Sequence, residues 1–132
     1  MSFQLPPVSQ IIAVAAGGSI GCLARFLAGH YCGMLFGTEF PWATLFVNVS
    51  GSAWLGYVGA LALAKPGLID PTWRLLLTTG FAGGFTTFSS LTFETLSLYQ
   101  RGELALASTN IIANLSLGCL AVILGVLASG LN

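Results

Sequence analysis

Polar and small side chains recur at intervals of four inside an otherwise apolar segment. They are Thr44, Asn48, Ser52 and Gly56, and this spacing places them on one face of a helix. An amide in such a segment most often joins helices by hydrogen bonds. The two N–H donors of Asn48 could equally bind an anion. Both roles stay open from the sequence, with the interhelical one the commoner.

The most unusual stretch is residues 79–91, Thr-Gly-Phe-Ala-Gly-Gly-Phe-Thr-Thr-Phe-Ser-Ser-Leu. Its glycines, hydroxyls and aromatics do not suit a continuous helix, because each interior Gly costs about 1 kcal/mol relative to Ala. Irregular backbone at membrane depth survives only where protein buries it or where it lines a wet cavity. We therefore expect a helix break at a functional site; a glycine-rich packing face between helices is the alternative.

Charged and amide side chains elsewhere in the apolar segments are further candidates. Arg25 either snorkels to the lipid head groups or faces protein and water, where it would help to attract an anion. Glu94 is a site candidate that could instead lie near the membrane interface or pair with Arg25. Asn110 and Asn114 are four residues apart, so they share a helical face with Gly118.

Composition requires a lipid environment for these segments. Of the 132 residues, 55% are hydrophobic and only 6% are charged, whereas a soluble domain has roughly 25% charged residues. The formal net charge of zero argues against nucleic-acid binding. The three cysteines match no metal or disulfide pattern, and the sequence contains no nucleophile–base set of an enzyme.

Four apolar segments fit one all-helical transmembrane domain over residues 1–132. We expect spans at about 10–31, 41–64, 72–100 and 104–127. The third is longer than one span needs, which suits two half-helices with the glycine-rich stretch between them. The first carries a Gly17/Gly21 pair that would let another helix approach closely.

The positions of the basic residues hardly predict which way the chain is oriented in the membrane. With four spans, Lys65 and Arg74 lie on one side of the membrane, and Arg101 lies on the other, joined by Arg25 if it snorkels. The number of basic residues is therefore nearly equal on the two sides, and the positive-inside rule predicts no preferred orientation. Such a chain could insert both ways, and two opposite copies could pair as an antiparallel dimer.

Three stretches together resemble the CrcB/Fluc family of fluoride channels, in order and over essentially the whole chain. They are Gly17-Gly18-Ser19-Ile20-Gly21 with Arg25-Phe26, then Thr44 to Ser52, and Gly80 to Ser89. The resemblance implies four transmembrane helices with a broken third helix in a dual-topology, antiparallel homodimer of the cell inner (plasma) membrane. It also implies two passive fluoride pores per dimer and a structural sodium ion (Na+) at the dimer interface.

The resemblance also assigns roles to individual residues. Phe88 would be one of two pore phenylalanines, and Leu91 stands at the position of the second, where this sequence departs from the family. Asn48 would be the pore asparagine, and the carbonyls of Gly83 and Thr86 would hold sodium. The remaining expected pore residues are Thr44, Thr87, Ser89, Asn110, Asn114, Arg25 and Glu94.

Two other classes remain to be separated from a channel. A small multidrug-type, proton-coupled exporter would also be a four-helix dual-topology dimer, but it needs an intramembrane carboxylate, for which Glu94 is the only candidate. A structural membrane subunit would use its Asn and Gly residues only to join helices. Fluoride transport in liposomes, compared with chloride and cationic dyes, distinguishes the three.

Overall fold

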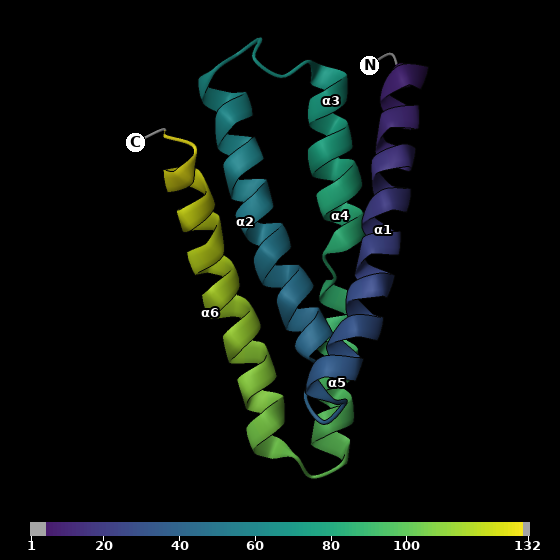
Figure 1. Ribbon diagram of the computed structural model, residues 1–132, viewed down its shortest axis with the longest axis vertical. Helices are drawn as coiled ribbons and strands as arrows, with labels where there is room; N and C mark the ends of the chain where they lie inside the picture. Colours follow the sequence, from purple (N-terminus) through teal and green to yellow (C-terminus); the bar gives the residue numbers. More distant parts are fainter. Residues whose placement is uncertain (1–4, 131–132) are drawn as a thin grey trace.

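The computed structural model describes residues 5–130, and all regular structure in that range is helical. The helices form four rods that lie roughly along one axis (Figure 1). Three rods are single helices: α1 (Val8–Phe36), α2 (Trp42–Ala64) and α6 (Leu104–Ala128). The other consists of α3 (Pro71–Leu75), the π-helix η1 (Leu76–Ala82), α4 (Gly83–Phe85) and α5 (Phe88–Gln100).

The helices α1, α2 and α6 are each long and apolar enough to cross a membrane. Their large apolar side chains are mostly exposed, as expected of surfaces that face lipid. The prediction of a multi-pass, all-helical membrane protein is therefore confirmed. The ends of the three helices agree with the expected spans to within a few residues, except that α1 continues to Phe36.

Glycines bring α1 against the first half of the divided rod. Gly17 and Gly21 are buried on α1, and a Cβ built on either would clash with backbone atoms of η1 or α4. A Cβ on Gly84 would likewise clash with the carbonyl oxygen of Gly18. Close backbone approach therefore accounts for these glycines, as in other tightly packed membrane helices.

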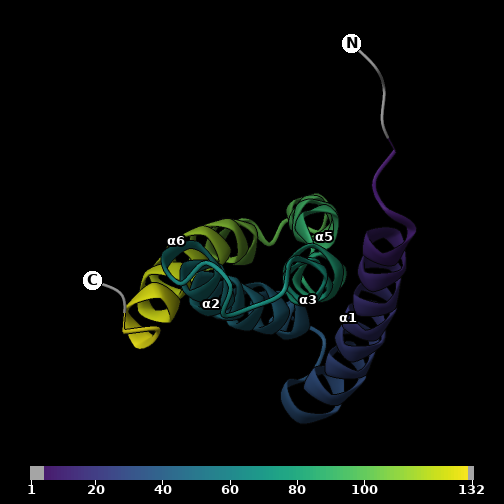
Figure 2. The same ribbon diagram turned by 90° about the horizontal axis from the view of Figure 1, so that it is seen from above.

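The helical backbone is interrupted two residues after the glycines. Thr86 (φ −79°, ψ 160°) and Thr87 (φ −153°, ψ 117°) are extended, between α4 and α5. None of the glycines at 80, 83 and 84 has a positive φ. Gly80 and Gly84 are thus helical packing surface against α1, Gly83 is helical but exposed, and the hydroxyl residues after them form the non-helical link. Seen from above, α3 and α5 are offset from one another (Figure 2).

A π-helix precedes this link, a form that is rare and frequent at functional sites. The indole N–H of Trp54 on α2 donates to the Leu77 carbonyl of η1 at 3.0 Å. The same ring packs edge-on against Phe81, which stacks on Phe85. This aromatic column fixes η1 against α2, and nothing in the sequence pattern indicated it.

The second half of the divided rod packs against a different neighbour. While α1 covers η1 and α4, α5 lies against α6, and α6 also packs along α2. Both ends of the described chain and the loop between α2 and α3 lie at one end of the molecule (Figure 1). The α1–α2 loop and the α5–α6 loop lie at the other end.

Candidate functional site: a polar seam at the helix interruption

Asn48 on α2 holds the interrupted backbone. Its Oδ1 accepts the Thr87 N–H at 2.8 Å, and its Nδ2 donates to the Thr87 carbonyl at 3.1 Å. The Nδ2 group also donates to Oδ1 of Asn114 at 2.8 Å. The Thr87 N–H, which has no helical partner because Thr86 and Thr87 are extended, finds one in Asn48, whose Nδ2 adds a second bond to the Thr87 carbonyl. Both amide donors of Asn48 are therefore engaged within the chain.

The hydrogen bonds continue from Asn48 across α6 to α5. Asn114 donates to Oδ1 of Asn110 at 3.1 Å and to its carbonyl at 2.9 Å. Asn110, which is fully buried, donates to the Thr95 hydroxyl at 3.0 Å, and Thr95 donates to the Leu91 carbonyl at 2.7 Å. Each amide thus finds partners, which a buried polar network needs in order to stabilise the packing.

A carboxylate extends the same polar surface toward the α1–α2 loop. The buried hydroxyl of Thr44, one turn before Asn48, donates to Oε1 of Glu94 at 2.8 Å. Oε2 of Glu94 is buried and has no hydrogen-bond partner among the described residues. The Thr44–Glu94 pair and the hydrogen-bonded network lie one helical turn apart on α2, and we call the two together the polar seam. Its members are Thr44, Asn48, Thr87, Glu94, Thr95, Asn110 and Asn114.

Hydroxyl groups cluster where α5 begins. Thr87 caps the helix, since its Oγ1 accepts the Ser90 N–H at 3.1 Å. The same oxygen lies 3.1 Å from Oγ of Ser90 and 3.2 Å from Oγ of Ser89, and Ser89 is exposed. These hydroxyls can rotate to present either a proton or a lone pair. The positive end of the α5 dipole points the same way, which favours negative charge beside them.

Phe88 and Leu91, the two positions at which the family resemblance implies pore phenylalanines, differ in exposure. The Phe88 side chain is 72% exposed, whereas Leu91 is only 5% exposed. Both line a cavity of about 620 Å³ together with Asn48, Thr87 and Asn114. Phe93 lines a different cavity, so within one chain it does not take the place of the aromatic ring that Leu91 lacks.

Arg25 lies beside the helix interruption. Its guanidinium donates to the Thr86 carbonyl at 3.1 Å. Of the two roles left open for Arg25, this contact favours the one in which the side chain faces protein, because the freed carbonyl offers it a partner. Arg25 forms no ion pair with Glu94 within residues 5–130; its partner is on the α1 side of the link.

The carbonyls of Gly83 and Thr86 have the chemistry that the predicted cation site requires. The Thr87 N–H, which would cap the Gly83 carbonyl in a continuous helix, instead bonds to Asn48. The Gly83 backbone is exposed, with open space where a Cβ would be. Carbonyls freed by a helix interruption are suitable ligands for sodium. The Thr86 oxygen accepts Arg25 and keeps a second lone pair.

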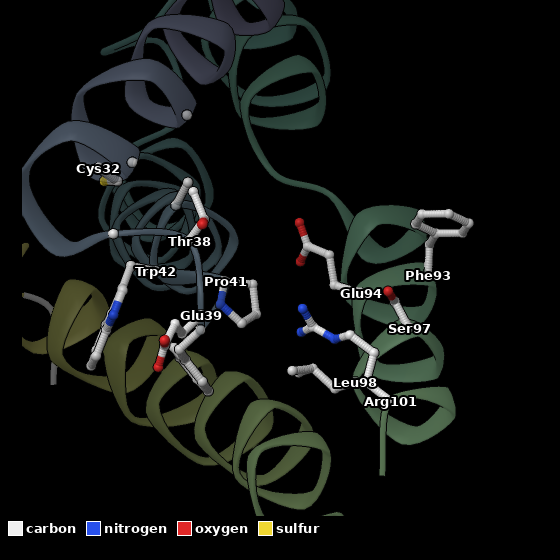
Figure 3. Close-up of a pocket in the computed structure, with 15 residues that line it drawn as sticks. Cys32, Thr38, Glu39, Pro41, Trp42, Phe93, Glu94, Ser97, Leu98 and Arg101 are labelled. Atoms are coloured by element: carbon white, nitrogen blue, oxygen red, sulfur yellow. The ribbon is translucent and has the colours of Figure 1, made fainter. Parts of the chain in front are cut away.

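Two cavities lie along the polar seam. The central cavity is the space of about 620 Å³ beside the interruption, and it is also lined by Ser52, Thr78 and Thr79. The mouth cavity, about 290 Å³, lies between the α1–α2 loop and the end of α5 (Figure 3). Glu94 lines the mouth cavity and Asn48 lines the central cavity, with Thr44 between them.

The predicted candidates thus fall into three groups. The first group lies along or beside the seam and comprises Thr44, Asn48, Thr87, Ser89, Glu94, Asn110 and Asn114. The second group, Phe88 and Leu91, lines the central cavity. The third is Arg25, which contacts the Thr86 carbonyl from α1. Sequence reasoning missed Thr95 and Trp54. The signal for Thr95 was its position beside Glu94 and one turn after Leu91, facing the Asn110/Asn114 face of the last span.

The apolar helices make this a multi-pass helical membrane protein. Amides, hydroxyls and one carboxylate lie in its interior, between the two cavities. Residues 12–126 match the family described as "CrcB-like protein, Camphor Resistance (CrcB)", and the chain belongs to that family.

Curated relatives cover almost the same length. One from Sulfurihydrogenibium sp. (strain YO3AOP1) is 43% identical over 90% of this chain and 95% of its own. Others from Shewanella amazonensis and Geobacter sulfurreducens are 44% and 40% identical over 88% and 92% of this chain, and over 91% and 98% of their own. Each is named "Fluoride-specific ion channel FluC", the name of a channel and not of an enzyme.

Proposed function

We propose that this protein conducts fluoride passively across the cell inner (plasma) membrane, through two pores formed by an antiparallel homodimer. Its relatives are named fluoride-specific ion channels. The observation that carries the proposal is the polar seam between the mouth cavity and the central cavity. Such a row of polar groups is costly in lipid, and it suits an ion that must exchange its water shell for protein groups.

The rotatable hydroxyls are better placed than the amides to take up the ion. Fluoride is small and strongly hydrated, so a pore has to replace water with N–H and O–H donors. The donors of Asn48 and Asn114 already hold the interruption together. Ser89 is exposed and can turn its hydroxyl proton outward, and the edge of the exposed Phe88 ring carries positive potential. Weak, exchangeable contacts of this kind let an ion leave again.

The dimer is part of the proposal because the central cavity is incomplete in one chain. It is an open space of about 620 Å³ that exposes amide and hydroxyl groups at mid-helix. Direct contact between such groups and lipid tails would be unfavourable. A second, oppositely oriented copy that covers the cavity would convert an open polar surface into a pore wall.

Sodium would be held by the Gly83 and Thr86 carbonyls, two from each copy. The ion would supply positive charge to oxygens that the interruption leaves without helical partners. Thr86 would need only its backbone for this, because its hydroxyl donates to the Ala82 carbonyl at 2.9 Å.

Fluoride efflux from liposomes tests the function directly. Purified protein is reconstituted into vesicles loaded with potassium fluoride, potassium chloride or a cationic dye, and a potassium ionophore starts passive efflux. We expect rapid fluoride loss, retention of chloride and no dye movement. Retention of fluoride would refute the proposal.

A proton-coupled exporter is the second candidate, favoured only by the unpartnered Glu94 oxygen. Such a carrier would move its substrate against a gradient when a proton gradient is imposed. Fluoride movement that follows its own gradient, and that continues without a proton gradient, separates the channel from the exporter.

A further inference from the structure

Three charged side chains line the mouth cavity, and the proposed conduction assigns them no joint role. Glu94 comes from α5, Arg101 directly follows the end of α5, and Glu39 comes from the α1–α2 loop. In Figure 3 the Arg101 side chain extends from α5 into the cavity on the same side as Glu94, and Glu39 lies toward the opposite wall. Phe93, also on α5, points away from them.

Arg101 is not engaged by either carboxylate. Glu94 uses one oxygen for Thr44, and its other oxygen has no partner in the described part of the chain. Both Arg101 and Glu39 are exposed. The guanidinium thus remains available to a dissolved anion, and it offers five N–H donors.

The position of Arg101 makes it the first cation met on the way to the polar seam from this end. The residue follows the last residue of α5, at the end of the molecule that carries the α1–α2 loop (Figure 1). Inward from it lie Glu94, then Thr44, then Asn48 at the central cavity.

Without Arg101 the mouth cavity would repel an anion. Glu39 and Glu94 would leave two carboxylates and no cation among its lining residues. Clefts lined by charge of one sign raise or lower the local concentration of ions, and arginine residues line anion-selective pores. We propose that Arg101 is the residue that receives fluoride in the mouth cavity, because its exposed guanidinium offers N–H donors and reduces the formal negative charge of the lining from two to one. This proposal rests on the proposed fluoride conduction.

The test compares fluoride efflux for Arg101→Gln and the unmodified protein at low ionic strength. We expect Arg101→Gln to be slower by about tenfold, at the lower end of electrostatic effects on ion encounter. The difference should shrink as an impermeant salt raises ionic strength, because roughly 0.1 M salt screens charges over about 10 Å. Arg101→Lys should restore flux, and adding Glu39→Gln to Arg101→Gln should recover part of it.

Arg74→Gln is the matched control. Arg74 is also exposed, but it belongs to α3 and lines a separate pocket with Asp70 at the other end of the molecule. We expect its substitution to leave efflux unchanged. Equal loss in both variants, equal efflux of Arg101→Gln and unmodified protein, or a loss that salt does not diminish would overturn the role of Arg101. Absence of fluoride efflux from the unmodified protein would instead overturn the proposed function, and this inference with it.

Discussion

At the scale of single residues, Asn48 is the clearest case in which structure changes the meaning of a sequence feature. The pattern left it as either an interhelical bond or an anion donor. The geometry assigns its amide to Thr87 and Asn114. Asn48 would then matter for conduction through the shape of the interruption, because its side chain is the hydrogen-bond partner of the Thr87 N–H.

Substitution of Asn48 by Asp should abolish fluoride flux while leaving the dimer intact. The carboxylate would replace two donors with acceptors that face the Thr87 carbonyl and Asn114 Oδ1, and it would repel fluoride. Efflux from liposomes and gel filtration measure the two properties.

Two further variants separate shape from charge. Asn48→Leu removes the donors without adding charge, and it should also lose most flux. Ser52→Ala, one turn away beside the central cavity, should conduct nearly normally. Normal flux in Asn48→Asp would remove Asn48 from the conduction path.

At the scale of elements, hydropathy predicted the positions of the helices because lipid imposes both length and apolar character on each span. Composition could not show which neighbour each glycine meets. Gly80 and Gly84 pack on the α1 backbone, and the extended residues are Thr86 and Thr87. The seam followed from four-residue spacing within each helix, but its connections between helices, including Thr95 and Glu94, depend on tertiary packing.

The contact between α1 and α4 should be sensitive to a single methyl group. Gly84→Ala would place a Cβ against the Gly18 carbonyl oxygen. We expect a loss of stability of about 1–3 kcal/mol, the usual cost of overpacking. Thermal unfolding in detergent measures the change. Gly59→Ala adds the same group to α2, where nothing lies within 4 Å, and it should be mildly stabilising because an interior helical Gly costs about 1 kcal/mol relative to Ala. Equal stability of the two variants would contradict the packing role of Gly84.

At the scale of the whole molecule, the few basic residues do not distinguish the two sides of the membrane. Lys65 and Arg74 lie toward the end that carries the termini, and Arg101 lies toward the other end. Arg25 is occupied at the interruption, so it adds to neither side.

This balance predicts that the chain inserts in both orientations. A single cysteine placed at one end, in a background free of the native cysteines, can be labelled from each side of the cell with an impermeant thiol reagent. We expect comparable labelling from both sides. Labelling from one side in nearly all molecules would exclude the antiparallel dimer.

Sodium should act as the link between the two copies. If the Gly83 and Thr86 carbonyls hold it at the dimer interface, replacing sodium by a large organic cation should shorten the dimer lifetime and lower fluoride flux together. Gly83→Val is a sharp probe, because the position has an ordinary helical backbone (φ −64°, ψ −36°) and open space around its Cβ in the single chain.

The fold of one chain therefore gives no steric reason for Gly83→Val to be harmful, although a β-branched residue slightly disfavours helix. A partner copy does give such a reason, since the side chain would crowd the proposed ion and the opposing backbone. We expect normal thermal stability of the monomer with a severe loss of dimer and flux, whereas Thr86→Ser, which keeps the carbonyl, should be mild. Single-molecule subunit exchange, with and without sodium, measures the dimer lifetime. If the lifetime is the same with and without sodium, and the same in Gly83→Val as in the unmodified protein, the Gly83 carbonyl has no role in assembly.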